Sequence, residues 1–422
     1  MLSRIEIPLN IDEIKLLHQR FLKNLIKPYK TRLPLGLIFW LFVLALILRL
    51  FLAYIYNTYG PSYVFLDELS YKSTADRLWR YWHSASFPEL FDYKKYAFQG
   101  FGGRNFGYNI VYALIAGLFG EFGARVANSF FVCLAAYFTY LMADEISNRK
   151  VAILAYILVL FYPSAILYSV TLHKEAFVIF SIALFMLSLT KMFRKISIKW
   201  LLISIFSFFC IFISRLYIPL LILLATSLLL IWHSRRNIFS WLVALILIVL
   251  IFYYLPDIIK ESIQLNSLLS WRRKAVLSVA SYWGSYRRLP LPTSFTALVF
   301  YSFQPLPFNF TSIWFVPINL GSLVWYMMFP FFLLGLSNCL KIKELRLIAI
   351  TLVFIVSFYV FIYVTGTEYR HRDQMISLLA IISAVGYYRF KSLSYYNKMV
   401  FLSIPCALIP VLGFYKLWVL LS

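Results

Sequence analysis

The stretch PLGLIFWLFVLALILRLFLAYIYNTYGPSYVFLDELSY, residues 34–71, joins a long apolar run to a pair of acids. Residues 34–56 are long enough to cross a bilayer as one α-helix, because about 20 apolar residues span the hydrocarbon core. Asp67 and Glu68 follow soon after this run. Placing ionisable groups beside a bilayer costs free energy, so the acid pair is expected to have a function. The stretch therefore predicts a membrane protein with polar chemistry just beyond its first span.

The rest of the chain repeats this apolar character. Of its 422 residues, 62% are hydrophobic, 20% are aromatic and 14% are charged, a ratio that a soluble domain cannot solvate. Apolar runs near the length of a membrane-crossing helix recur, so we expect an all-α polytopic membrane protein with about 11 spans. The candidate spans are 34–56, 124–143, 151–170, 176–193, 200–214, 216–232, 238–255, 313–337, 347–365, 374–388 and 399–421.

Charge and cysteine content exclude several classes of protein. The formal net charge of +23 would suggest nucleic acid in a soluble protein, but in a membrane protein it is typical of basic cytosolic loops and of contact with anionic lipid. No glycine-rich phosphate loop and no HExxH sequence occurs, which argues against a cytosolic nucleotide-dependent enzyme. The cysteines show neither disulfide nor zinc spacing and are expected to be structural: Cys133, Cys210, Cys339 and Cys406.

The chain divides into a short leading segment and one long domain. Residues 1–33 carry no apolar region typical of a cleaved signal peptide, and their apolar side chains fall on one helix face among Lys and Arg. This pattern predicts an amphipathic segment on the cytosolic membrane surface. Residues 34–422 then form a single transmembrane domain. Its expected extracytoplasmic loops are large at about 57–123 and 256–312 and short near 170–175 and 366–373.

Two ambiguous stretches are assigned by counting membrane crossings. Residues 106–120 would reach only about 22 Å as a helix, short of a roughly 30 Å core, so we expect them to lie along the outer surface. Residues 200–232 are interrupted by Arg215 and Pro219. Two short helices with Arg215 at the outer turn keep the following basic loops cytosolic, in agreement with the positive-inside rule.

The acid pair is the first candidate for chemistry. On a short helix Asp67 and Tyr71 share a face, because residues four apart are neighbours. We expect Asp67 to act as a general base that accepts a proton from a hydroxyl, with Glu68 as a second catalytic acid and Tyr71 as a substrate contact. The alternative is a solvated loop acid that caps a helix.

A second candidate is the sequence TLHKE at residues 171–175, which leads directly into an apolar helix. Glu175 would lie in the first turn of that helix, where the dipole favours an anion. A plain N-terminal acid and a second active-site acid are both open for Glu175. His173 and Lys174 are candidate substrate contacts beside it.

Basic residues on the outer side form the third candidate. Positive charge there runs against the usual bias, and arginine binds a lipid phosphate or pyrophosphate with two parallel hydrogen bonds. The alternative is contact with lipid headgroups or pairing with Glu368 and Asp373. The candidate phosphate contacts are Arg104, Arg215, Arg370 and Arg372, together with Arg272, Arg273, Lys274, Arg287 and Arg288 in the late loop.

Together these positions resemble the GT-C superfamily of polyprenyl-phosphate-dependent glycosyltransferases, in particular bacterial members related to protein mannosyltransferases and aminoarabinose transferases. The similar features occur in order over most of residues 34–388. They are Asp67, Glu68 and Tyr71 after the first span, LFGEFGARVANS after a glycine-rich stretch, Glu175, YSFQPLPFNF, and GTEYRHRDQMISLLAIISA. Two departures are GYN at 107–109, where many members have a PP dipeptide, and Glu rather than Asp at 175.

The resemblance implies a GT-C-type helix bundle with extracytoplasmic juxtamembrane helices, and Asp67 as the base. It implies inverting transfer of a sugar from a polyprenyl-phosphate donor to a hydroxyl of a glycan, lipid or protein, as in cell-envelope polysaccharide biosynthesis. The expected place is the outer face of a bacterial inner membrane, and the partners are lipids rather than nucleic acid. No cofactor is required, although Asp67, Glu68 and Glu175 could bind a divalent cation.

Two other functions remain open. An O-antigen-type polysaccharide polymerase or ligase also has many spans and a basic outer loop, but its chemistry depends on Arg and His rather than on an acid such as Asp67. A transporter or lipid flippase would place ionisable residues within the spans. Most charges here fall in loops, and Arg49 is the main exception, expected near an external helix end where it can reach the interface.

Overall fold

The described part of the structure is all-helical. The computed structural model describes residues 35–61, 66–84, 106–215, 217–233, 302, 313–339, 342–363, 369–395, 397–399, 401 and 403. Within these residues the elements are helices, without a strand. They are α2 (Leu35–Tyr59), α3 (Leu66–Ser84), α5 (Phe106–Ile146), α6 (Arg149–Leu160), α7 (Pro163–Val170), α8 (Glu175–Arg194), α9 (Ile198–Ser214), α10 (Tyr217–His233), η4 (Ile313–Phe315), α14 (Val316–Cys339), α15 (Lys343–Ser357), η5 (Phe358–Tyr363), α16 (Tyr369–Asp373) and α17 (Ile376–Lys391).

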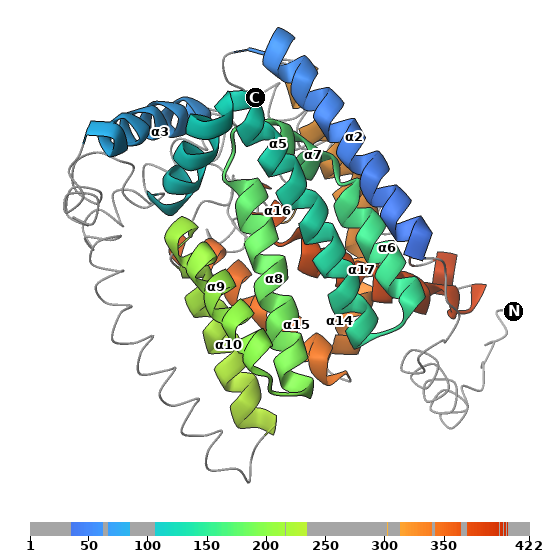
Figure 1. Cartoon of the computed structure of the whole chain (residues 1–422). Helices are drawn as coiled ribbons and strands as arrows, with labels where there is room; N and C mark the ends of the chain where they lie inside the picture. Colours follow the sequence, from blue (N-terminus) through green and yellow to red (C-terminus); the bar gives the residue numbers. More distant parts are fainter. Residues whose placement is uncertain are drawn as a thin grey trace, which may run out of the picture.

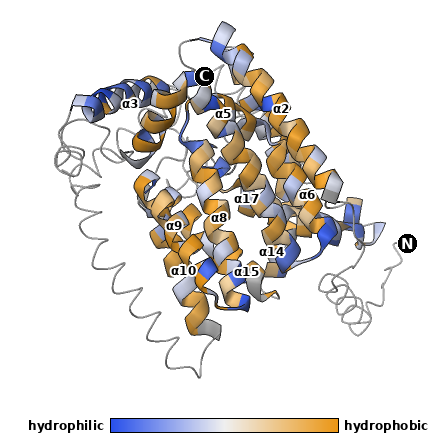
Figure 2. Ribbon diagram, viewed as in Figure 1, coloured by the Kyte–Doolittle hydropathy of each residue, from blue (hydrophilic) through white to orange (hydrophobic). Residues whose placement is uncertain are grey.

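The helices form a bundle around α8 (Figure 1). Helix α5 packs along α8, α6 packs along α5, and α14 packs against α17. In its most apolar 18-residue window, 83% of α8 is buried, which is expected of a helix that is hydrophobic on all sides. Helix α3 lies at one end of the bundle beside the first part of α5, and Figure 2 shows that it is more hydrophilic than the bundle helices.

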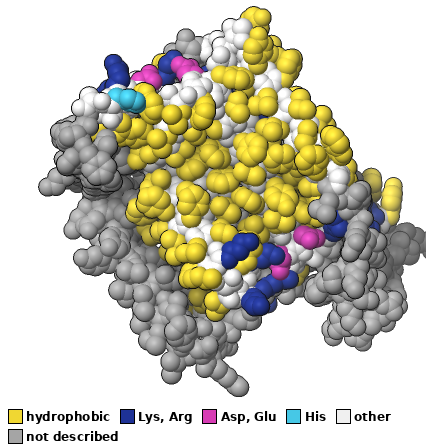
Figure 3. Space-filling model, viewed as in Figure 1, with side chains coloured by type: hydrophobic (Ala, Val, Ile, Leu, Met, Phe, Trp, Pro, Cys, Tyr) yellow, Lys and Arg dark blue, Asp and Glu magenta, His cyan; other side chains and the backbone are white. Residues whose placement is uncertain are grey.

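The described helices are those of an integral membrane protein. Four of them are long and apolar enough to cross a membrane, and the bent pair α6–α7 would make a fifth. Figure 3 shows charged side chains near two opposite ends of the molecule and hydrophobic side chains between them. The full number of spans stays a prediction, because 238–255 and most of 399–421 lie outside the described residues, as do residues 1–33.

Several helix breaks follow the sequence prediction and one does not. The expected break at Arg215 is confirmed, since α9 ends at Ser214 and α10 begins at Tyr217. Residues 106–120 are helical as expected, and the chain changes direction at Gly120, whose φ of 72° suits glycine because it has no Cβ. Within the expected span 151–170, an unpredicted break before Pro163 separates two helices bent by 50°, which together would still make one span.

Arg49 corrects one expectation. It does not lie near a helix end in contact with the interface, because its side chain is completely buried in the middle of α2. Its guanidinium donates to the carbonyl oxygens of Leu160 at 2.5 Å and Ala45 at 3.2 Å. Leu160 is the last residue of α6, and terminal carbonyls lack a partner within their own helix. Arg49 therefore satisfies a backbone group that the α6–α7 break exposes.

The described cysteines fit the structural role expected for them. Cys133, Cys210 and Cys339 are buried and form no disulfide, and Cys406 lies outside the described residues.

Candidate functional site

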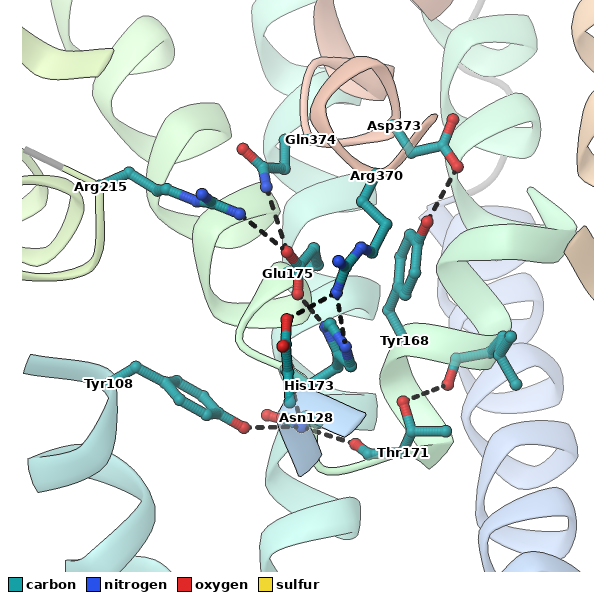
Figure 4. A network of polar contacts seen from close by, with 12 residues as sticks. Tyr108, Asn128, Tyr168, Thr171, His173, Glu175, Arg215, Arg370, Asp373 and Gln374 are labelled. Atoms are coloured by element: carbon teal, nitrogen blue, oxygen red, sulfur yellow. Dashed lines mark hydrogen bonds and ion pairs between the residues drawn. The ribbon is translucent and has the colours of Figure 1, made fainter. Parts of the chain in front are cut away.

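The candidate site lies where the turn after α7 enters α8, and Figure 4 shows side chains from distant parts of the chain meeting there. The turn and the first residue of α8 supply His173, Lys174 and Glu175. The α9–α10 turn supplies Arg215, and α3 supplies Asp67. Helix α16 and the residue after it supply Arg370 and Gln374.

Glu175 is the buried centre of the cluster. It lies in the first turn of α8, as predicted, where the helix dipole favours its charge. Its carboxylate accepts from Arg215 Nη2 at 3.0 Å and from Gln374 Nε2 at 3.3 Å, and it pairs with His173 Nδ1. Its side chain has no exposed area, so these protein groups replace water around the charge.

Asp67 forms the accessible edge of the same cluster. Arg370 Nη1 donates to Asp67 Oδ2 at 2.8 Å and lies 3.2 Å from His173 Nε2. A guanidinium has donors only, so His173 Nε2 accepts and the ring proton lies on Nδ1, toward Glu175. The Asp67 side chain is 48% exposed, whereas that of Arg370 is 16% exposed. Asp67 can therefore be reached from outside while it remains connected to the buried groups.

The two adjacent acids face different surroundings. Glu68 is buried and accepts from the Tyr56 hydroxyl of α2 at 3.4 Å, so it faces the first span rather than the cluster. Tyr71 shares a face with Asp67, as predicted, and its ring lies 6.1 Å from the ring of His173. Burial, followed by the charge of Glu175, raises the pKa of the Tyr71 phenol, which keeps it protonated.

Lys174 adds a second cation close to the exposed edge. Its side chain is buried, and its ammonium nitrogen lies 5.6 Å from the centre of the Tyr71 ring. Burial, and then the positive charge of Arg215, lower the pKa of the Lys174 ammonium to about 7. The charges of Glu175 and Asp67 oppose this shift.

The lowered pKa of Lys174 makes the free energy of unfolding depend on pH. The folded value of about 7 lies below the ordinary value of 10.5, so the folded protein binds fewer protons than the unfolded chain between these values. The free energy of unfolding should therefore rise as pH increases through this window. Lys174→Met should remove this part of the rise, as measured by denaturant unfolding at several pH values. Lys72→Met is the control, because that lysine is half-exposed on α3. An equal pH slope in wild type and Lys174→Met would contradict the assignment.

Polar side chains of α5 bond to the backbone of the turn that carries His173 and Lys174. Asn128 Nδ2 donates to the carbonyl oxygens of Thr171 at 2.9 Å and His173 at 3.3 Å. Arg125 Nη1 donates to Val170 O at 2.9 Å, and Ser129 Oγ to Ser169 O at 3.2 Å. These contacts were not predicted. The signal was present in ARVANS, where polar residues at 125, 128 and 129 share one face of an apolar helix.

Arg372, predicted as a phosphate contact, lies apart from Asp67 in a buried ion pair. Its Nη2 lies 3.2 Å from Asp373 Oδ1, its Nη1 donates to Ser302 O, and its side chain is 3% exposed. The alternative pairing with Asp373 is therefore the one observed. Outside the described residues lie Arg104, Arg272, Arg273, Lys274, Arg287, Arg288 and Glu368.

A divalent cation at Asp67, Glu68 and Glu175 stays a prediction. Among the described residues, no group of three or more His, Cys, Asp and Glu side chains is placed to hold a metal ion. Glu175 instead pairs with Arg215, and Glu68 faces Tyr56.

Comparison with known proteins finds a distant similarity to solved structures. No protein-family model and no curated protein matches the chain. One similar solved structure is the archaeal oligosaccharyltransferase AglB from Archaeoglobus fulgidus, in complex with an inhibitory peptide and a dolichol-phosphate. The match has 12% identity and a TM-score of 0.46, and covers 90% of this chain and 54% of that one. The chain thus spans about half the length of AglB, and its function rests on the geometry of its own residues.

Proposed function

We propose that the protein is a membrane glycosyltransferase that moves a sugar from a polyprenyl-phosphate donor to an acceptor hydroxyl, with inversion, at the extracytoplasmic face. The observation that carries this proposal is the half-exposed Asp67 bonded to Arg370 at the edge of a buried cationic cluster. An accessible carboxylate beside cations is suited to accept a proton while a nearby anion leaves.

The charges of the cluster favour an anionic ligand. Three cations, Lys174, Arg215 and Arg370, surround two carboxylates, Asp67 and Glu175. The guanidiniums of Arg215 and Arg370 balance the two carboxylates, and Lys174, whose pKa is about 7, supplies the excess positive charge in its protonated form. A lipid phosphate would balance it, and a partly buried site strengthens that attraction relative to water.

The reaction uses these groups without a further reactant. The acceptor oxygen attacks the anomeric carbon, and its proton passes to a carboxylate oxygen of Asp67. The bond between the anomeric carbon and the phosphate oxygen breaks, and its electron pair leaves with the lipid phosphate. Arg370 and Lys174 would stabilise the charge that develops on that oxygen. The resemblance of the sequence to GT-C enzymes supports the same reaction.

The direct test is to incubate purified protein in lipid with a panel of polyprenyl-phosphate sugars and measure released lipid phosphate. Sugar-dependent release is expected, and no release from any member of a broad panel would count against the proposal.

A polymerase or ligase is the second candidate, because Arg370 contacts His173 as well as Asp67. In that case activity would depend on Arg370 and His173 but survive the loss of the Asp67 carboxylate. A transporter is less well supported by the described ionisable groups, since Arg49 within α2 is bonded to backbone carbonyls.

Arg370→Ala should weaken donor binding by about tenfold, the size expected for losing a hydrogen bond to a charged group. Arg370→Lys keeps the charge but loses the paired donors, so it should restore affinity only partly. Binding of donor lipid is measured in nanodiscs of fixed composition. Arg80→Ala is the matched control, because that exposed arginine of α3 bonds to the carbonyl of Asp76. Unchanged affinity in both Arg370 variants would rule out the phosphate contact.

A further inference from the structure

Helix α16 carries Arg370 into the site although it is only 5 residues long. A helix this short is not stable by itself, because helices below about 12–15 residues are marginal without tertiary contacts. Arg370 and Gln374 lie four residues apart on one side, and Gln374 N donates to Arg370 O at 3.1 Å. These two side chains reach Asp67, His173 and Glu175. The orientation of α16 therefore decides whether Arg370 and Gln374 reach the cluster.

The carboxylate of Asp373 fixes α16 to α7. It is buried, with 1% of its area exposed. The Tyr162 hydroxyl donates to Asp373 Oδ1 at 3.1 Å, and the Tyr168 hydroxyl donates to Asp373 Oδ2 at 3.1 Å. Figure 4 shows Tyr168 beneath α16, next to the turn that holds His173. The centres of the Tyr168 and His173 rings are 5.9 Å apart.

Arg372 fixes the same short helix from another direction. Its Nη1 donates to Ser302 O at 3.2 Å, and its guanidinium lies 5.2 Å from the centre of the Trp325 ring of α14. Trp325 Nε1 donates to the same carbonyl at 2.5 Å. Both side chains of the Arg372–Asp373 pair are withdrawn from water.

We propose that Asp373, held by Tyr162 and Tyr168, is a positioning residue that sets the orientation of α16 so that Arg370 meets Asp67. Asp373 itself bonds to Tyr162, Tyr168 and Arg372. It acts through the backbone of α16, which joins it to Arg370 three residues earlier. The inference deepens the proposed function, but its test requires no sugar donor.

Replacing Asp373 itself is a poor test, because a buried charge pair that loses one partner often prevents folding. Tyr162→Phe and Tyr168→Phe keep the pair Arg372–Asp373 and remove only the hydroxyls. Tyr156→Phe is the matched control. Tyr156 lies on α6, and its buried hydroxyl donates to Ile38 O of α2 at 3.1 Å rather than to a residue of α16.

The measured quantity is the labelling of Asp67 by a water-soluble carbodiimide, read at each residue by mass spectrometry. Pairing with Arg370 should suppress this labelling, because the hydrogen bond from Arg370 Nη1 occupies Asp67 Oδ2 and hinders the reagent. Exposed Asp76 of α3 serves as the internal reference. We expect Arg370→Ala, which removes a hydrogen bond to the charged Asp67, to raise its labelling by about tenfold, and the variant with both Tyr162→Phe and Tyr168→Phe to raise it toward that level.

Tyr156→Phe should leave labelling of Asp67 at the wild-type level even if it lowers thermal stability. The proposal is overturned if the folded double variant labels like wild type while Arg370→Ala labels more strongly. It is also overturned if Tyr156→Phe raises labelling as much as the double variant, because the effect would then be a general loss of packing. Absence of glycosyl transfer in the wild-type protein would refute the proposed function and leave this result unaffected.

Discussion

Asp67→Asn should lower the rate of sugar transfer by about 10²–10⁴-fold, the usual effect of losing a general base. Asparagine keeps the size of the side chain but cannot accept the proton of the acceptor hydroxyl. The measurement is released lipid phosphate under saturating donor, so that a change in donor affinity does not hide the effect on turnover.

The Asp67 variant should remain folded. Asp67 lies in the first turn of α3 and pairs with Arg370, but its side chain is 48% exposed. Because the carboxylate is half-exposed, its loss should cost less than the roughly 3–5 kcal/mol typical of breaking a fully buried pair. Asp76→Asn, which changes an exposed acid on the same helix, should transfer at the wild-type rate. Near-normal transfer by Asp67→Asn would refute the base and favour a polymerase or ligase.

Glu175→Gln should lower the free energy of unfolding by about 3–5 kcal/mol, because it leaves the buried guanidinium of Arg215 without its counter-charge. Arg215 Nη2 lies 3.0 Å from Glu175 Oε1, with 10% of the arginine and none of the glutamate side chain exposed. Gln374 and His173 also bond to this carboxylate, so their orientation depends on it. Chemical unfolding in detergent, followed by circular dichroism, measures the loss.

Glu145→Gln provides the comparison for this variant. Glu145 pairs with Lys191 and Arg194 at the opposite end of α8, where 29% and 46% of the lysine and arginine side chains are exposed. Pairs of this kind contribute about 0–1 kcal/mol. If Glu175→Gln were no more destabilising than Glu145→Gln, the buried cluster would not stabilise the fold, and a chemical role for Glu175 would gain support.

Local sequence rules predicted much of the helical framework and part of the site. Hydrophobic run length placed α2 and α8, the interruption at Arg215 separated α9 from α10, and the apolar helix after TLHKE put Glu175 in its first turn. The shared face of Asp67 and Tyr71 also follows from helix periodicity. Each of these features depends on residues close together in the chain.

The remaining features depend on contacts between distant residues. Arg370 and Asp67 are separated by 303 positions, and Gln374 and Glu175 by 199, so no local period connects them. The same is true of Arg49, whose burial follows from the α6–α7 break 111 residues away. Arg370 and Arg372 look equivalent as an Arg-x-Arg pair, yet only packing against α14 and α7 separates their surroundings.

The change of direction at Gly120 divides α5 into two segments with different packing partners. Residues before it pack Tyr108 and Tyr112 beside α3, whereas residues after it pack against α8. A methyl group at Gly120 would meet nothing within 4 Å, so backbone conformation rather than crowding favours glycine there. The backbone angle at Gly120 thus helps to set where α3 lies, and with it the place at which Asp67 meets Arg370.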